Sequence, residues 1–204
     1  ESSENEIIFD LSKVEFITPF GIILIAGTIA ECHAKSRSVK YIRPLKPVAR
    51  RFLSGIGFNK FFRISDPESH KIESPNIQLK RIYSVDYLLT DQILQVFSQS
   101  ISMSEGVAGS LKLALNELMT NAFDHSESSL GCYVCAQTYN QAKTIRLCIA
   151  DFGIGILKSL KKADEFEYLR SDDEAIKLAV QERVTSRINR EAGYGLSHIH
   201  RFIK

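Results

Sequence analysis

The feature that most constrains the fold of this chain is an apolar pattern of helical period near its middle, in residues 113–126 and just before them. Because residues three and four apart share one face of a helix, the pattern predicts an amphipathic helix with one face packed inward. The residues of this inward face are Leu111, Leu115, Leu118 and Ala122.

Acid, amide and imidazole groups stand on a different face of the same predicted helix. Glu117 and Asn121 are four residues apart and therefore share a face, and Asp124 and His125 follow one turn later. Most helices with one Glu and one Asn on a face are solvated surface helices, so this helix alone does not indicate a site.

Two glycine-containing segments follow later in the chain. The first comes directly after residues 144–150, which alternate as a strand, and the second opens the last predicted helix. An isolated glycine pair is typical of an ordinary turn, but here the order and spacing of three segments must be explained together. The two segments are Asp151-x-Gly153-x-Gly155 and Gly193-x-Gly195-Leu196.

The three segments together resemble the N box and the two glycine boxes of the GHKL ATP-binding family, which includes gyrase, Hsp90, histidine kinases and MutL. The resemblance covers residues 77–204 and implies an α/β chain with a Bergerat ATP-binding fold, which is an α+β two-layer sandwich. It also implies that the chain binds ATP together with Mg2+. The matching N box is Glu117-x-x-x-Asn121.

The resemblance implies a role for each matched position, and each role has a physical reason. Asn121 is expected to ligate Mg2+, because an amide oxygen is a hard ligand. Glu117 is expected to be the catalytic base that takes a proton from the group attacking the terminal phosphate. Asp151 is expected to accept a hydrogen bond from the adenine amino group. The glycines let the backbone approach the base and offer amide groups to the phosphates.

The long charged connection between Gly155 and Gly193 corresponds to the ATP lid of the family, and its length suits that role. A short helix is expected at 173–183 within it. Which lid side chain touches the terminal phosphate stays open. The expected ATP-binding residues are Asn121, Asp124, His125, Asp151, Gly153, Gly155, Thr185, Ser186, Arg187, Gly193, Tyr194, Gly195 and Leu196.

The N-terminal part predicts a smaller α/β unit with strands at 6–10 and 39–42 and helices at 20–35 and 48–54. Residues 6–62 resemble part of a STAS domain, the fold of anti-sigma-factor antagonists, whose first strands would precede this sequence. The positions that carry this looser resemblance are Phe16-Ile17-x-x-x-Gly21 and Val48-Ala49-Arg50-Arg51-Phe52-Leu53.

One departure from the STAS pattern bears on regulation. Phosphorylatable members carry Ser or Thr directly before the turn glycine, whereas here Pro19 and Phe20 precede Gly21 and only Thr18 offers a hydroxyl. The departure favours a fixed docking or dimerising role over regulated phosphorylation. Stoichiometric phosphate on Thr18 after incubation with ATP would contradict this hypothesis.

The predicted domain plan is a partial STAS-like domain at 1–65, a linker at 66–76 and a GHKL domain at 77–204. Within the GHKL part, a strand is expected at 77–82, a helix at 85–101 and a hairpin of strands at 131–139 and 144–150. The family normally continues into one or two further strands, so a sheet with those strands missing is expected here. The sequence also lacks an initiating Met, which favours a fragment.

The composition indicates the general class of protein. The chain has 204 residues, 44% of them hydrophobic and 25% charged, with a net charge of +2, which is typical of a globular protein. No apolar stretch reaches the roughly 18 residues of a membrane span and no signal peptide is visible, so a cytoplasmic location without a membrane partner is expected. Cys132-x-x-Cys135 lies in a strand, where residues three apart face opposite sides, so buried free thiols are expected.

Residues 32–65 contain nine Lys or Arg and no Asp or Glu. Such a segment can bind nucleic acid, but the cations are dispersed over helix, strand and loop rather than clustered with aromatic residues, which favours a solvated basic face.

The expected function is that of a bacterial ATP-binding regulatory protein of the anti-sigma-factor or serine/threonine-kinase type, which controls a protein partner by phosphorylation or partner switching. Whether it is a kinase, a slow ATPase or a non-catalytic nucleotide-dependent switch stays open, as do the partner and a homodimer. Nucleic-acid binding by the basic N-terminal part is the third, disfavoured alternative.

Overall fold

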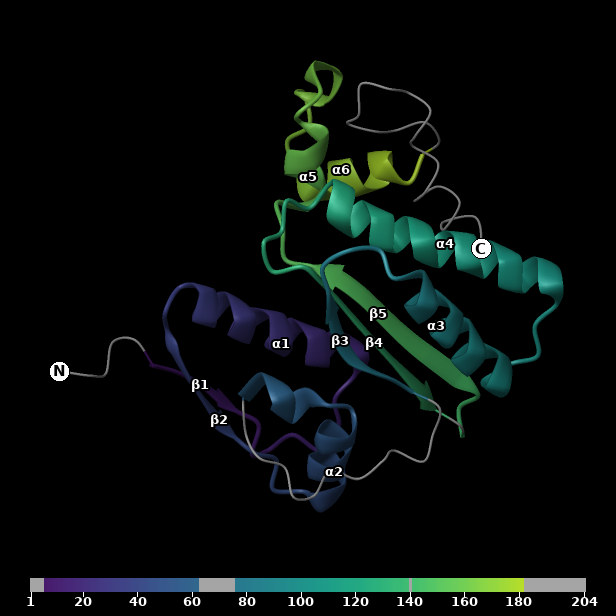
Figure 1. Cartoon of the computed structure of the whole chain (residues 1–204). Coiled ribbons are helices and arrows are strands. Elements are labelled where there is room, and N and C mark those ends of the chain that lie inside the picture. Colours follow the sequence, from purple (N-terminus) through teal and green to yellow (C-terminus); the bar gives the residue numbers. More distant parts are fainter. Residues whose placement is uncertain (1–5, 63–75, 140, 182–204) are drawn as a thin grey trace. The chain divides into compact units, whose positions relative to one another are not determined.

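The computed structural model describes residues 6–62, 76–139 and 141–181 (Figure 1). Helices and two small sheets make it a mixed α/β chain, as expected. The chain divides into two compact units. Unit 1 comprises Glu1–Arg81, Val96–Ile101 and Tyr133–Ala150, and unit 2 comprises Ile82–Gln95, Ser102–Cys132 and Asp151–Lys204.

The N-terminal elements of unit 1 form the predicted βαβ arrangement. Strands β1 (Glu6–Asp10) and β2 (Ser38–Ile42) pair in parallel, with Glu6 opposite Ser38 and Asp10 opposite Ile42. Helix α1 (Pro19–Ala34) connects them, because parallel strands need a crossover. The helix α2 (Pro47–Gly55) and a 3-10 turn, η1 (Phe58–Phe62), follow. Their core includes Ile22, Ile23, Ile29, Leu53, Ile56 and Phe58, all fully buried.

The second sheet of unit 1 contains β3 (Ile77–Ile82), β4 (Cys132–Tyr139) and β5 (Thr144–Asp151), in that order. Strand β3 pairs with β4 along one edge. Its other edge forms hydrogen bonds with the end of α2. The Leu79 amide donates to the Ile56 carbonyl over 3.0 Å, and the Gln78 side-chain amide donates to the Gly55 carbonyl over 2.9 Å. The N-terminal elements and this sheet are therefore joined within one unit.

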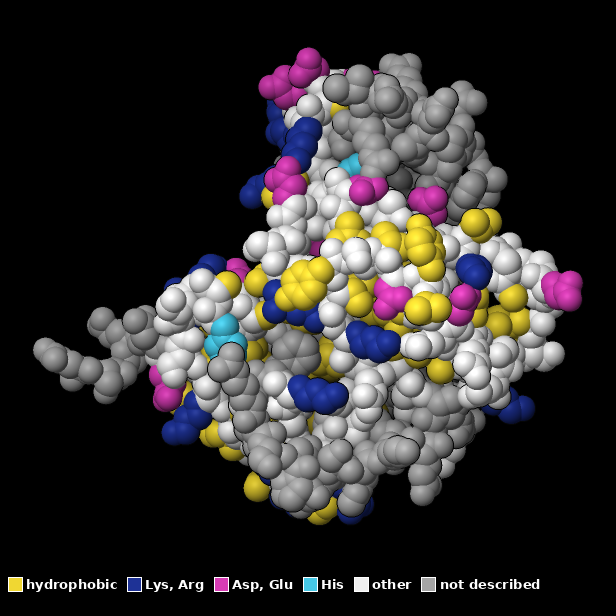
Figure 2. All heavy atoms as spheres, in the orientation of Figure 1, with side chains coloured by type: hydrophobic (Ala, Val, Ile, Leu, Met, Phe, Trp, Pro, Cys, Tyr) yellow, Lys and Arg dark blue, Asp and Glu magenta, His cyan; other side chains and the backbone are white. Residues whose placement is uncertain are grey.

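Unit 2 is organised by α4 (Glu105–Asp124), the helix that carries the predicted N box. Its buried face consists of Leu111, Ala114, Leu115, Met119 and Ala122. Leu118, which the sequence pattern places on that face, is only half-buried. On the face shown in Figure 2, hydrophobic and acidic side chains lie together over the region of α3 (Tyr87–Ser100) and α4.

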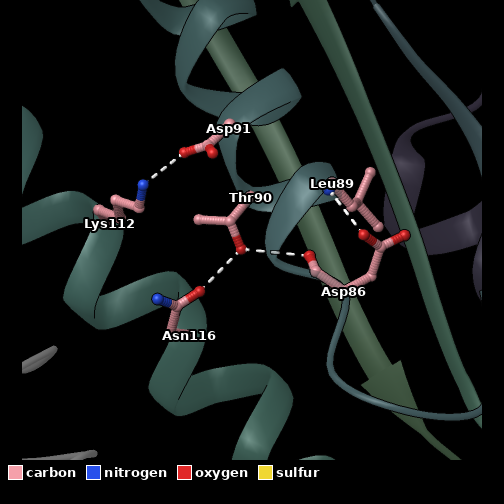
Figure 3. A network of polar contacts seen from close by, with 6 residues as sticks. All are labelled: Asp86, Leu89, Thr90, Asp91, Lys112 and Asn116. Atoms are coloured by element: carbon pink, nitrogen blue, oxygen red, sulfur yellow. Dashed lines mark hydrogen bonds and ion pairs between the residues drawn. The ribbon is translucent and has the colours of Figure 1, made fainter.

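Polar contacts tie the start of α3 to α4 (Figure 3). The hydroxyl of Thr90, which is fully buried, donates to the Asn116 side-chain oxygen over 2.8 Å. Asp91 and Lys112 form an ion pair at 2.6 Å, and the Asp86 carboxylate caps α3 by accepting the Leu89 amide at 2.9 Å. These contacts fix the first turn of α3 against α4.

The described part of the predicted lid is a small helical body with its own apolar core. It contains α5 (Gly155–Leu160), a 3-10 turn, η2 (Asp164–Phe166), and α6 (Asp172–Ala179). The buried core residues are Leu160, Leu169, Ala175 and Ala179. The predicted helix at 173–183 is therefore wrong at its end, because the chain leaves the helix after Ala179 through a turn at Val180.

Apart from the central helix, the other predicted strands and helices among the described residues are confirmed to within one or two residues at their ends. The central helix begins earlier than the pattern predicts, at Glu105. The helix predicted after Gly193 lies outside the described residues. The predicted linker at 66–76 lies outside the described residues except for its last position. Among the described residues, no helix combines the length and the apolar character needed to cross a membrane.

All four cysteines are free thiols, and three of them, Cys32, Cys132 and Cys135, are buried. Burial, with a smaller effect of the neighbouring Cys148 thiol, raises the pKa of Cys135 to about 12. Burial also raises the pKa of Cys148, which is only half-buried.

Candidate functional site

The polar face of α4 presents the predicted N-box side chains at its C-terminal end. Glu117 and Asn121 are half-buried, and Asp124 is exposed. His125 caps the helix, and its amide donates to the Asn121 carbonyl over 3.1 Å. The last turns of α4 therefore place a carboxylate, an amide and an imidazole close together along the chain.

The first glycine segment forms a tight turn directly after β5. The Asp151 carboxylate accepts the Gly153 amide at 2.9 Å. A Cβ atom added to Gly153 would lie 1.9 Å from the Ser126 carbonyl oxygen, so no other residue fits this position unless the backbone moves. Gly155 has a φ of +78°, a conformation that glycine adopts without strain.

Ser126 joins this turn to the end of α4. Its carbonyl oxygen accepts the Ile154 amide at 2.8 Å, and its hydroxyl donates to the Ala122 carbonyl one turn earlier in the helix. The same hydroxyl accepts the Ser128 amide at 3.1 Å. Through these bonds, the segment of Asp151 and Gly153 is held beside the C-terminal end of α4.

A cation from the start of the lid lies at the same end of α4. Lys162 forms an ion pair with Glu127, and it also acts electrostatically on His125. Burial, followed by the positive charge of Lys162, holds the pKa of His125 below its usual value of 6.5. The imidazole is therefore neutral at pH 7, and it can accept as well as donate a hydrogen bond.

The donor chemistry fits the nucleotide and the ion that the sequence predicts. Asn121 supplies one hard oxygen, which suits Mg2+ that keeps phosphate oxygens and waters as its other ligands. Among the described residues, no three His, Cys, Asp or Glu side chains form a metal-binding group. Asp151 uses one carboxylate oxygen for Gly153, and a carboxylate has lone pairs for further donors such as an adenine amino group.

The second glycine box lies outside the described residues, as do the predicted phosphate-contacting residues of the lid. These positions are Thr185, Ser186, Arg187, Gly193, Tyr194, Gly195 and Leu196. Of the predicted site, the structure thus joins the first glycine segment to Ser126, directly after the C-terminal end of the helix that carries the predicted N box.

Thr18, the hydroxyl closest in sequence before Gly21, has a structural role. Its side chain caps α1 by accepting the Gly21 amide at 3.3 Å. The capping bond orients this hydroxyl toward the helix that follows it.

Three residues of the site were not predicted from the sequence: Ser126, Glu127 and Lys162. Ser126 directly follows the N-box segment, so its place at the end of a helix is the one signal that could have drawn attention to it. The ion pair of Glu127 and Lys162 joins residues 35 positions apart, which no local pattern reveals.

In comparisons with protein-family models, curated proteins and solved structures, no significant match to the chain was found.

Proposed function

We propose that the chain is an ATP-binding regulatory protein of the GHKL type, with a Bergerat-like nucleotide-binding part and a STAS-like N-terminal part. It controls a protein partner by phosphorylation or by partner switching, in the manner of anti-sigma-factor kinases. The observation that carries the proposal is the close approach of Gly153 to the Ser126 carbonyl. This approach holds the first glycine segment beside the helix that bears Glu117 and Asn121.

In the proposed mechanism, Asn121 would hold Mg2+ and Asp151 would select adenine. Bound Mg2+ neutralises phosphate charge during phosphoryl transfer. Glu117 stands one turn before Asn121 on the same helix and takes the proton of an attacking hydroxyl or water. The lid body of α5 and α6 begins directly after the adenine-binding turn, so nucleotide binding at Asp151 acts on the start of the lid.

Calorimetric titration tests binding, with ATP and a non-hydrolysable analogue, with and without Mg2+. The expected result is Mg2+-dependent binding to the wild type that Asp151→Asn removes, because the asparagine keeps an oxygen for Gly153 but presents an amide to adenine. Glu105→Asn is a matched control at an exposed acid in the first turn of α4. A wild type that binds neither nucleotide would refute the proposal.

Glu117→Gln separates the catalytic form of the proposal from the non-catalytic switch. Loss of ATP turnover with retained nucleotide binding supports phosphoryl transfer. Nucleotide-dependent release of the partner that is unchanged in Glu117→Gln supports the switch, because a switch needs only the ordering of a surface.

A further inference from the structure

A surface at the start of α3 exposes large apolar side chains next to carboxylates. Tyr83, Tyr87 and Leu88 are 66%, 61% and 75% exposed, which is unusual for three such residues within six positions. In the sequence, Asp86 lies between the two tyrosines, and Asp91 follows Leu88 by three residues. Residues 82–111 contain no Lys or Arg. We refer to Tyr83, Asp86, Tyr87, Leu88 and Asp91 as the tyrosine patch.

The part of the tyrosine patch that lies in α3 is held against α4. The bond from Thr90 to Asn116 and the ion pair of Asp91 with Lys112 fix the first turn of α3 on α4 (Figure 3). Surfaces that are already ordered lose little entropy when they bind, and tyrosine is enriched in the centres of protein interfaces. The patch therefore has the properties of a protein-binding surface.

A second surface, in unit 1, has the opposite charge. Leu45 and Val48 are 76% and 68% exposed, and Lys46 and Arg51 are exposed beside them. We refer to these four residues as the basic patch. Residues 32–62 contain no Asp or Glu, and their eight cations are Lys35, Arg37, Lys40, Arg43, Lys46, Arg50, Arg51 and Lys60.

The basic patch is also fixed by the fold. The Leu45 amide donates to the Ser12 carbonyl over 3.0 Å. Helix α2 begins at Pro47 and is anchored by the buried side chains of Ala49 and Leu53. Val48 and Arg51 are three residues apart in α2 and therefore share one side of the helix, and Leu45 directly precedes its N-cap residue, Lys46.

Each patch has one neighbouring side chain of the opposite charge, and the net charge of the patch keeps its sign. Glu15 lies 3.4 Å from Lys46, and Lys112 lies 2.6 Å from Asp91. Both pairs are at the surface, where ion pairs contribute little to stability.

We propose that the basic patch of one copy of this chain binds the tyrosine patch of a second copy. Leu45 and Val48 pack against Leu88, and the cations meet the carboxylates and the tyrosine rings, which attract cations electrostatically. A nucleic acid fits the basic patch less well, because its exposed apolar residues are aliphatic, whereas single-stranded nucleic acids stack on aromatic side chains. The contact joins two different patches, so it associates copies head to tail.

Sedimentation velocity of the full chain over a range of concentrations tests the proposal. Self-association of the wild type is expected. It should weaken as the salt concentration is raised from 50 to 500 mM, because salt screens the attraction between the two patches. Leu45→Glu and Leu88→Arg should each weaken self-association by about tenfold or more, as expected for the loss of a central interface residue. The controls Leu24→Glu and Ile176→Arg replace exposed apolar residues outside both patches, at 48% and 50% exposure, and should behave as the wild type.

An equimolar mixture of the two variants is the decisive measurement. The Leu45→Glu chain keeps an intact tyrosine patch and the Leu88→Arg chain keeps an intact basic patch, so the mixture should form one-to-one pairs. A wild type that is monomeric at every concentration would overturn the proposal, as would variants that associate normally. A mixture that fails to associate would also overturn it, because an intact basic patch and an intact tyrosine patch would then be present without binding each other.

Discussion

At the scale of single residues, Gly153 is the glycine with the least room for a side chain among the glycines that the structure describes. Gly153→Ala places a methyl group against the Ser126 carbonyl oxygen, at a separation of 1.9 Å before any adjustment. We expect this change to destabilise the chain by about 1–3 kcal/mol or more, as overpacking does. Urea unfolding measures it. Gly109→Ala is the matched control, since its Cβ meets nothing within 4 Å and alanine favours a helix by about 0.5–1 kcal/mol. Equal stabilities of the two variants would refute the close approach.

His125 gives the chain a dependence on pH. Its pKa in the folded state lies below the usual value of 6.5, so the unfolded chain binds more protons between these two values. Stability therefore rises with pH across that interval and is lost as the pH falls through it. Lys162→Gln should raise the pKa of His125, because the charge of Lys162 is one of the two causes that lower it.

An NMR titration of the His125 imidazole measures this shift. Lys177→Gln is the control, because Lys177 pairs with Asp173 on α6. A His125 pKa that stays constant or falls in Lys162→Gln would contradict the assigned cause.

At the scale of helices, the contact of α3 with α4 depends on a polar pair of which Thr90 is fully buried and Asn116 half-buried. Thr90→Val keeps the shape of the side chain but removes the donor to Asn116. An unsatisfied buried acceptor costs about 1–3 kcal/mol, and thermal or urea unfolding should show that loss. Thr28→Val is the control, because the Thr28 hydroxyl bonds within its own helix, to the Leu24 carbonyl at 2.7 Å. A loss of the same size in both variants would show that Thr90 contributes no more than a local bond.

The sequence predicted strands and helices well where one local period dominates. The strands β1, β2 and β3 and most of the buried face of α4 follow from such patterns. The start of α4 is less evident, since Gly106 and Gly109 weaken the helical signal, although Ser104 caps the helix by accepting the Val107 amide.

The lid body and the role of Ser126 could not be predicted in the same way. The residues of the lid core, Leu160, Leu169 and Ala175, come from three short elements with no shared period. The hydrogen bond from Ile154 to Ser126 joins residues that are 28 positions apart in the sequence. Only folding brings these two residues together. The N box and the first glycine segment were predicted as separate motifs, and their connection through Ser126 was not.

At the scale of the whole chain, unit 1 joins the N-terminal elements to the three-stranded sheet. Phe58 is fully buried and contacts the rings of Tyr41 and Phe62. Phe58→Ala should cost about 3–5 kcal/mol. The amide of Leu79 should then exchange faster with solvent, because its acceptor is the carbonyl of Ile56, close to the removed ring in sequence.

Hydrogen exchange measured residue by residue tests this coupling. Val48→Ala, at an exposed side chain, should leave the exchange of Leu79 unchanged. Faster exchange confined to residues 47–62 in Phe58→Ala would show that the N-terminal elements open independently of the sheet.

The burial of the thiols has a practical consequence for labelling the protein. With a pKa of about 12, the Cys135 thiol is ionised to the order of 1 part in 100,000 at pH 7, and only the thiolate reacts with maleimides. Cys32 and Cys132 are shielded by burial as well, at 5% and 0% exposure. A cysteine introduced at the exposed position of Tyr168 should therefore react with a fluorophore first, so that the helical body of α5 and α6 can be labelled with all four native cysteines in place.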